Sequence, residues 1–210
     1  MLVDGQVAAT GQKVFPTQKV IVEGQRAERE KEMLLLAVNK PRGVLCSTDD
    51  RWGDTTIDAF LKYPKRVFPI GRLDKDSEGL LLMTNHGDIL NKIMRAGNYH
   101  EKEYEVEIDR PVTEKFIRKM QQGVWLKELE QMTRPCEVKK IGEKKFSIIL
   151  TQGLNRQIRR MCQTCGCKVL RLKRVRIMNI TLGNLKTGEY REVTDGEIEE
   201  LYERIKESRA

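Results

Sequence analysis

Residues 66–83 read RVFPIGRLDKDSEGLLLM and place a dense polar loop between two apolar segments. The flanking segments 66–70 and 79–83 are predicted strands, and Gly71 and Gly79 frame the charged loop between them. A loop held between two strands presents its side chains from rigid ends, which is a common place for function. An ordinary polar connection explains the loop equally well, so this stretch alone fixes two strands but no chemistry.

The segments on either side of this stretch indicate the fold class. Strands are expected at 34–39, before a turn at Lys40-Pro41-Arg42-Gly43, and at 103–108, 146–150 and 175–182. Helices are expected after the capping residues 84–88, after Thr113, from near Asn155 and over 195–206. Strands and helices mix without a strict βαβ alternation, which predicts an α+β fold. Its central sheet should be mixed, largely antiparallel and flanked by helices.

The first 32 residues have a different organisation. Residues 1–25 contain two turn signals, Asp4-Gly5 and Glu23-Gly24, beside short alternating segments. Residues 26–32 are almost all charged and are predicted to be a linker. The main domain is expected over 33–210.

Charge placement points to a polyanionic partner. The chain of 210 residues has a formal net charge of +8, and no Asp or Glu occurs from Lys144 to Gly188. Such a segregated basic segment favours nucleic acid over a membrane surface, because no basic amphipathic helix with aromatic anchors accompanies it. No apolar run approaches the length that spans a bilayer, and no signal-peptide pattern is present, so a cytoplasmic protein is expected. The five cysteines lack the spacing of a metal site and are interpreted as reduced thiols.

Two further clusters carry candidate chemistry. In residues 153–161, GLNRQIRRM, Arg156 and Arg160 share a helix face, while Arg159 borders the buried stripe. A guanidinium in that border position needs a carboxylate, which must come from elsewhere in the fold. On the strand at 103–108, Lys102 and Tyr104 point the same way, although a tyrosine at the edge of a core would look the same.

The motifs 39–43 (NKPRG), 71–74 (GRLD), 102–104 (KEY) and 153–161 (GLNRQIRRM) occur in the order found in pseudouridine synthases of the small-ribosomal-subunit (Rsu) type. The resemblance covers about residues 33–205, and the stretch 66–77 is most similar to members that act on the large subunit. It implies the pseudouridine synthase fold and a cofactor-free enzyme. Residues 3–24 resemble the last strands of an S4-type RNA-binding domain, whose two preceding helices have no counterpart in this sequence.

The resemblance also implies roles for individual residues. Asp74 would be the essential carboxylate, either as a nucleophile at C1′ or as a base that takes a ribose proton. Arg159 would form a salt bridge with Asp74, and Tyr104 would lie against the uracil. RNA contacts are expected from Arg72, Lys40, Lys102, Asn155, Arg156, Gln157, Arg160, Lys173, Arg174 and Arg176. The substrate would be a uridine of 23S ribosomal RNA, with transfer RNA open as a second substrate, and the enzyme would be a monomer.

Other functions explain parts of the sequence. A non-catalytic RNA-binding or ribosome-assembly protein accounts for the basic segment, but has no use for a carboxylate held among arginines. A metal-dependent nuclease would cluster Asp74, Asp76 and Glu78 around an ion, and its activity would not survive EDTA. A DNA-binding regulator lacks a recognition motif.

Overall fold

The structure is a computed structural model that describes residues 1–15, 17–27, 33–47, 53–94, 97 and 99–208. The chain divides into two compact units, Met1–Met33 and Leu34–Ala210, which are described separately. None of the described helices has the length and apolar composition needed to cross a membrane.

The first unit is a small antiparallel sheet with the order β2-β1-β3-β4. Asp4-Gly5 and Glu23-Gly24 both have positive φ angles, as two-residue hairpin turns require, so both predicted turns are confirmed. Arg26 is the last residue of β4 rather than the start of a linker, and residues 28–32 of the expected linker lie outside the described residues. The strands are β1 (Leu2–Val3), β2 (Gln6–Val7), β3 (Val20–Val22) and β4 (Gln25–Arg26).

Among the described residues, the second unit is built on one sheet of nine strands with the main order β11-β12-β8-β13-β7-β5-β15. β7 and β13 run parallel, and the other neighbours along this order are antiparallel, which confirms the mixed, largely antiparallel sheet. β6 pairs with β7, and β14 pairs with β13. The strands are β5 (Leu35–Lys40), β6 (Phe68–Pro69), β7 (Glu78–Thr84), β8 (Lys102–Ile108), β11 (Glu137–Gly142), β12 (Lys145–Leu150), β13 (Val169–Ile177), β14 (Ile180–Thr181) and β15 (Tyr190–Glu192).

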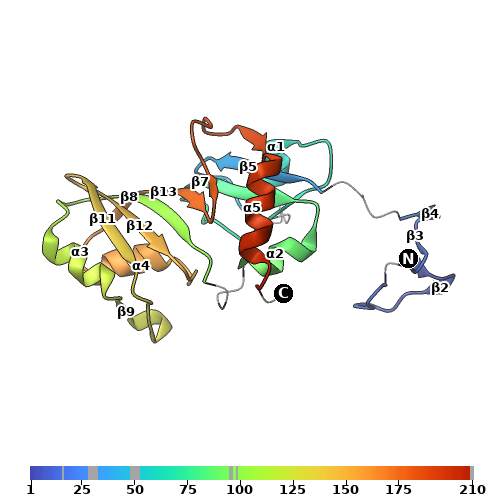
Figure 1. Ribbon diagram of the computed structural model, residues 1–210, viewed down its shortest axis with the longest axis horizontal. Coiled ribbons are helices and arrows are strands. Elements are labelled where there is room, and N and C mark those ends of the chain that lie inside the picture. Colours follow the sequence, from blue (N-terminus) through green and yellow to red (C-terminus); the bar gives the residue numbers. More distant parts are fainter. Residues whose placement is uncertain (16, 28–32, 48–52, 95–96, 98, 209–210) are drawn as a thin grey trace. The chain divides into compact units, whose positions relative to one another are not determined.

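The parallel pair forms a seam between two halves of this sheet (Figure 1). β7 approaches β13 very closely there, because Gly79 has no side chain: a Cβ at Gly79 would lie 2.2 Å from the carbonyl oxygen of Arg174. Gly79 also has a φ of +102°, a conformation that L side chains rarely adopt. The glycine that ends the polar loop in the sequence is therefore required by the contact between the two halves.

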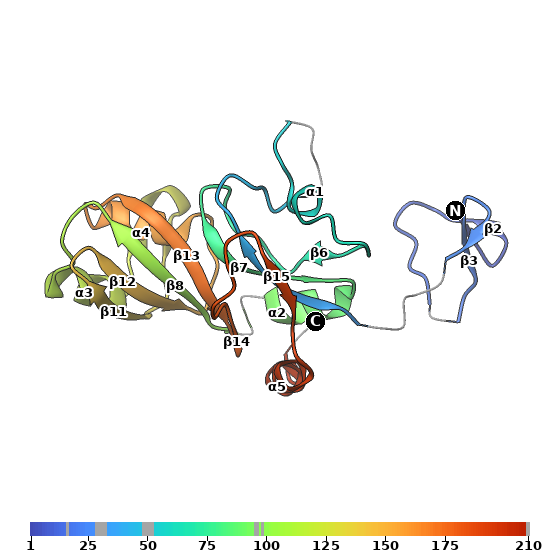
Figure 2. The same ribbon diagram turned by 90° about the horizontal axis from the view of Figure 1, so that it is seen from above.

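Helices cover the two halves separately. α3 and α4 pack against the half that contains β8, β11, β12 and β13, and α2 and α5 lie on the face of the other half opposite α1 (Figures 1 and 2). The expected cap at Thr113 is present, since its Oγ1 accepts from the amide of Phe116. Thr194 and Glu197 form a capping box at α5 that was not predicted from the sequence. The helices are α1 (Ile57–Leu61), α2 (Gly87–Met94), α3 (Glu114–Gln121), α4 (Gln157–Thr164) and α5 (Asp195–Ile205). A short hairpin of β9 (Trp125–Leu126), 3-10 helix η2 (Lys127–Leu129) and β10 (Gln131–Met132) follows α3.

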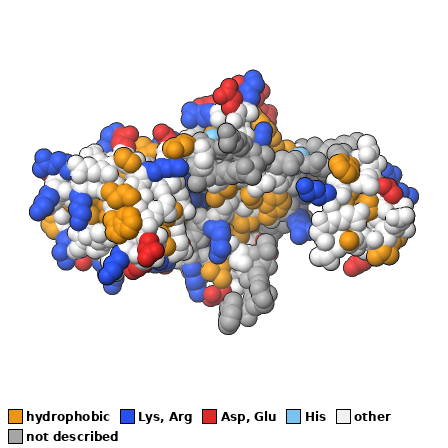
Figure 3. Space-filling model, turned by 90° about the horizontal axis from the view of Figure 1, so that it is seen from below, with side chains coloured by type: hydrophobic (Ala, Val, Ile, Leu, Met, Phe, Trp, Pro, Cys, Tyr) orange, Lys and Arg blue, Asp and Glu red, His pale blue; other side chains and the backbone are white. Residues whose placement is uncertain are grey.

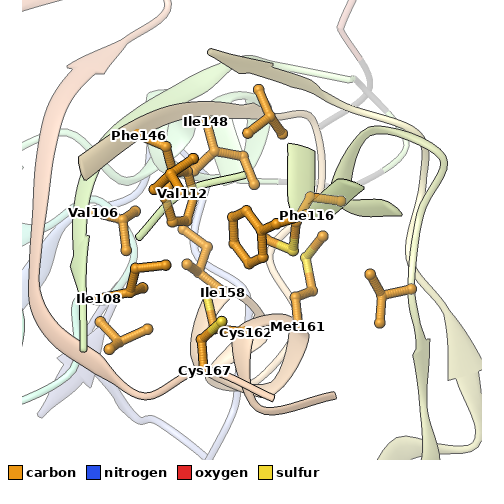
Figure 4. Packing of buried hydrophobic residues seen from close by; sticks show 14 of the residues in the cluster. Val106, Ile108, Val112, Phe116, Phe146, Ile148, Ile158, Met161, Cys162 and Cys167 are labelled. Atoms are coloured by element: carbon orange, nitrogen blue, oxygen red, sulfur yellow. The ribbon is translucent and has the colours of Figure 1, made fainter. Parts of the chain in front are cut away.

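The first half has its own hydrophobic core (Figure 4). Phe116 of α3 and Phe146 of β12 form an edge-to-face pair with ring centroids 5.2 Å apart. From α4, Ile158 and Met161 are buried against the same cluster, as their helical spacing predicts. This packing fixes α4, and therefore the arginines of residues 153–161, relative to the sheet.

Two predicted strands differ from the structure. The expected strand 175–182 is wrong as a single element: β13 ends at Ile177, the chain turns at Met178 with a φ of +51°, and it returns as β14. The expected strand 66–70 is reduced to Phe68–Pro69, which pair with β7, although the amide of Ile70 still donates to the carbonyl of Leu82 in β7 at 2.7 Å.

Candidate active site

The loop before β7 is fixed by main-chain hydrogen bonds. The amide of Ser77 donates to the carbonyl of Asp74 at 3.0 Å, which closes a turn, and the amide of Gly43 donates to the carbonyl of Lys75 at 2.7 Å. The Asp74 side chain keeps 32% of its surface exposed, at the mouth of a cavity. Asp74 is therefore an accessible carboxylate on a rigid support, as the sequence predicts.

Lys40 lies behind this loop, and its predicted contact with RNA is wrong. Its side chain is completely buried, and Nζ donates to the carbonyls of Ser77 and Pro41, each at 2.9 Å. Burial lowers the pKa of Lys40, while the nearby charges of Asp74 and Asp76 act in the opposite direction. Lys40 holds the loop in place from inside, which explains why β5 ends in a lysine.

Asp76 is the carboxylate that organises Arg156, the residue just before α4, and Arg159 within α4. Arg156 donates to it with both terminal nitrogens, Nη1 to Oδ1 at 3.2 Å and Nη2 to Oδ2 at 3.0 Å. Arg159 lies with Nη2 3.3 Å from Oδ2 of Asp76 and donates to the Asp76 carbonyl at 3.1 Å and to Oγ of Ser77 at 3.3 Å. Burial opposes ionisation of Asp76, but the hydrogen bonds from Arg156 and the charge of Arg159 outweigh it, so the pKa of Asp76 lies below its ordinary value.

Asp74 was expected to pair with Arg159, but in the structure it pairs with Arg156. Asp74 is paired with Arg156, whose Nη1 lies 3.7 Å from Oδ2 of Asp74. Arg159 is one helical turn further along and meets Asp76 instead. The prediction that Arg159 takes its partner from another part of the fold is confirmed, but the partner is two residues after the expected one.

A cavity of about 540 Å³ opens beside Asp74 at the seam between the halves. Asp74 and Arg156 lie on its rim, and Tyr104, Lys102 and Arg174 line it from β8 and β13. Its apolar walls come from five different elements and the loops between them, and this volume is in the range of ligand pockets. The apolar residues are Pro69, Leu73, Leu90, Met94, Leu150, Leu154, Ile158 and Leu172.

A second hollow of about 640 Å³ adjoins the first, because Asp74 and Arg156 line both. Arg72 also lines both and is exposed, and Asn155 lines the second. Three predicted RNA-contact residues therefore surround the carboxylate on its open side. Gln157 also lines the cavity, but its side chain is buried and its Oε1 accepts from the amide of Leu154 at 3.1 Å, so it holds the loop before α4.

The basic segment of the sequence is largely neutralised in three dimensions. Arg160 forms an ion pair with Glu128, and Arg176 with Glu101 and Glu103. On the face drawn in Figure 3, Lys and Arg side chains form separate groups with Asp and Glu between them. The expectation of one open basic field is therefore wrong for Arg160 and Arg176, since strands and loops far away in the sequence bring acids to them.

Lys173 is opposed in the same way, because it faces Glu105 in the register between β13 and β8. Within the described part of the chain, no three His, Cys, Asp or Glu side chains lie close enough together to hold a metal ion.

Comparison with known proteins adds the family. Residues 34–164 match the family model of RNA pseudouridylate synthases. The chain is 50% identical over 210 residues to the dual-specificity RNA pseudouridine synthase RluF of Escherichia coli strain K12, covering 99% of this chain and 71% of that protein. It is 35% identical over 205 residues to the ribosomal large subunit pseudouridine synthase B of Bacillus subtilis strain 168, covering 95% and 84%.

A solved structure agrees with these sequence relatives. A crystal structure of a pseudouridylate synthase superposes with a TM-score of 0.78 at 29% identity, covering 95% of this chain and 87% of the other. The chain therefore belongs to the RNA pseudouridylate synthase family.

Proposed function

We propose that this enzyme converts a uridine of large-subunit ribosomal RNA to pseudouridine, with Asp74 as its essential carboxylate. The observation that carries the proposal is the position of Asp74, partly exposed at the rim of a cavity whose walls are mainly apolar. Two relatives support the substrate class: the dual-specificity RNA pseudouridine synthase RluF and the ribosomal large subunit pseudouridine synthase B.

The reaction breaks the bond between N1 of the base and C1′ of the ribose, turns the base, and joins C5 to C1′. One proton leaves C5 and one is gained at N1, so nothing is oxidised or reduced. Asp74 acts either as a nucleophile at C1′ or as the base that removes a ribose proton. Both routes need an ionised carboxylate, and the guanidinium of Arg156 supplies a complementary charge 3.7 Å from it.

The surrounding residues divide into contact and positioning roles. Tyr104 offers a ring against which the base stacks inside the cavity. Arg159 acts through Asp76, which in turn orients Arg156 toward Asp74. Arg159 is therefore a functional residue that acts as a positioning residue, through Asp76 and Arg156.

The target uridine must leave its stack to reach the cavity, which costs a few kcal/mol and less in a loop or bulge. Arg72 is exposed beside both hollows, so its side chain can fill the space that the base leaves in the RNA stack or bind a flanking phosphate. We propose that residues 1–25 are S4-like and contact RNA, with Lys13 and Lys19 as phosphate contacts. Replacing both by glutamine should weaken RNA binding and its salt dependence without changing the rate at saturation.

The decisive experiment is base-resolution pseudouridine mapping on undermodified ribosomal RNA and on transfer RNA. Wild type, Asp74→Asn and Asp58→Asn are compared; Asp58 is a matched control because it is exposed on α1 and does not line the cavity. We expect one new site in large-subunit RNA with wild type and with Asp58→Asn, and none with Asp74→Asn. Binding without any new site would instead support the non-catalytic RNA-binding alternative.

We also propose a location and an oligomeric state. The enzyme is expected in the cytoplasm, where it would meet ribosomal RNA, and it is expected to be a monomer. Light scattering at the concentration of the assay tests the monomer, since a dimer would double the measured mass.

A further inference from the structure

Two buried cations line the cavity, Lys102 and Arg174, and neither has the carboxylate partner that Arg156 and Arg159 have. Lys102 is 8% exposed and Arg174 is 3% exposed. Nζ of Lys102 donates to the carbonyl of His100 at 3.3 Å, and Nε of Arg174 donates to the carbonyl of Leu80 at 2.7 Å. Neither forms an ion pair with an acid in the described part of the chain, and Nη2 of Arg174 is buried without an acceptor.

This arrangement destabilises the protein, because a buried charge is costly unless it is paired. Burial lowers the pKa of Lys102 to about 8, and the charge of Arg174 adds to the shift. Uncompensated charge of this kind is typical of sites where a ligand supplies the opposite charge.

The position of Lys102 and Arg174 indicates which class of ligand would bind there. Lys102 and Tyr104 lie two residues apart on β8, and Arg174 faces Tyr104 across the register with β13. All three line the same cavity, whose remaining walls are mainly apolar. A flat base fits such walls, whereas a backbone phosphate is better placed against the exposed cations Arg72 and Arg156 than against these two buried ones.

If the chain has the proposed function, the base becomes that anion during the reaction. When the N1–C1′ bond breaks, its electron pair leaves with the base, and the negative charge spreads from N1 over the ring to the carbonyl oxygens. We propose that Lys102 donates from Nζ to a carbonyl oxygen of the target base and stabilises this charge, while Arg174 keeps the floor of the cavity positive behind it. The base then returns its electron pair through C5 to C1′, C5 loses its proton, and N1 gains one.

A donor of this kind acts more strongly on the charged transition state than on the neutral bound base. Loss of Lys102 should therefore reduce the rate of the chemical step and leave RNA affinity almost unchanged. A lysine that gripped a phosphate would show the reverse pattern, with a higher Kd and a smaller salt dependence of binding.

The test is single-turnover kinetics with the full chain in excess over an RNA that wild type modifies and Asp74→Asn does not. The comparison of wild type with Asp74→Asn tests the proposed function by itself, before any change at Lys102 is made. The variants are Lys102→Met, Lys102→Gln and Lys102→Arg, with Lys139→Met as a matched control, because Lys139 is exposed on β11 and paired with Glu137. Thermal melts show that each variant is folded, and Lys102→Gln replaces Lys102→Met if the latter is not.

We expect Lys102→Met to lower the rate constant at saturation by about 100-fold with a Kd within threefold of wild type, as for the loss of one oxyanion donor. Lys102→Arg should recover at least a tenth of the wild-type rate, and Lys139→Met should equal wild type. A Lys102→Met rate within threefold of wild type would overturn the proposal. So would a loss confined to Kd, or an arginine variant as slow as the methionine variant.

Discussion

Replacing Lys102 by methionine is expected to stabilise the fold while it impairs the reaction. The pKa of Lys102 falls from 10.5 to about 8 in the folded protein. This difference corresponds to about 3 kcal/mol lost on folding when the side chain is charged, at about 1.4 kcal/mol for each pKa unit. Methionine removes that cost but also the hydrogen bond to the carbonyl of His100, worth about 1 kcal/mol. The net gain in the free energy of unfolding is about 2 kcal/mol, or a rise in Tm of roughly 4–8 °C for a chain of this length.

The pH dependence of the free energy of unfolding tests the same prediction in a second way. Because the folded-state pKa of Lys102 lies below its unfolded-state value, the unfolded chain binds more protons between about pH 8 and 10.5. The cost of the buried charge is fully present below pH 8 and disappears as the pH rises through this window. The advantage of Lys102→Met over wild type should therefore be largest at pH 7 and shrink toward pH 10.

The assay is urea unfolding of the free proteins at pH 7, 8.5 and 10, followed by circular dichroism. Lys139→Met serves again as the control, since Lys139 is exposed and its ion pair with Glu137 raises its pKa, so no gain at pH 7 is expected. A Lys102→Met variant that is less stable than wild type at pH 7 would refute the reasoning. A gain that stays constant with pH would also refute it, because the gain would then have a cause other than the charge.

Three further changes test the fold and the site. Gly79→Ala should lower stability by more than about 3 kcal/mol, because its Cβ would lie 2.2 Å from the Arg174 carbonyl oxygen; a Tm within 2 °C of wild type would contradict the close approach. Tyr104→Phe keeps the ring, which packs against the core of Figure 4 and against a second buried cluster that includes Leu36 and Leu81, so its Tm should not change. Its turnover should fall tenfold or more if the hydroxyl helps remove the C5 proton, and an unchanged turnover would show that the hydroxyl is not needed. Hydrogen bonds from Arg191 lower the pKa of Glu197 to about 2, so this pair stabilises the fold above pH 4.5 and loses its effect as the pH falls toward 2. Glu197→Gln should therefore lower Tm at pH 7 and flatten its decline over that acid range, whereas an unchanged acid profile would rule the pair out as the cause.

The strands of the sheet were predictable where local pattern and burial agree. The apolar run 34–38 and the segment 79–83 are buried throughout and pair with each other in β5 and β7. The half-buried β8 follows from its alternation, and α3 from its cap at Thr113. In each case the pattern that decides the element lies within about ten residues, which is the range that sequence periodicity can report.

Features hidden by a competing pattern or set by distant contacts were not predictable in the same way. The expected strand 175–182 is two strands because the chain turns at Met178-Asn179, and Asn179 was a turn signal within that segment that the alternating apolar pattern concealed. The parallel contact of β7 with β13 is a second such feature, because it joins segments about ninety residues apart. The sequence contained one trace of it, the conformationally free Gly79, which was interpreted only as the end of a loop.

The site shows the same division between chemistry and placement. The residue types at the cavity were predicted: a carboxylate at 74, a tyrosine at 104 and arginines on one helix. The pairing was not, because Asp74 and Asp76 are both acids next to one turn, and only the docking of α4 decides which arginine each one meets. The sequence pattern places Arg156 and Arg159 about one helical turn apart, whereas in the structure Arg156 precedes the helix with a φ of +50°.

The basic segment shows why net charge along a sequence overstates a binding surface. The acid-free residues include most of β13, but β13 lies beside β8, whose glutamates alternate with its apolar residues. Arg171, Lys173 and Arg176 consequently face Glu107, Glu105 and Glu103 in the register. Cross-strand pairs of opposite charge stabilise a sheet and reduce the field that reaches solvent. Arg174 is the cation of β13 that informs about the site, because it faces Tyr104 rather than a glutamate and lines the cavity beside Asp74.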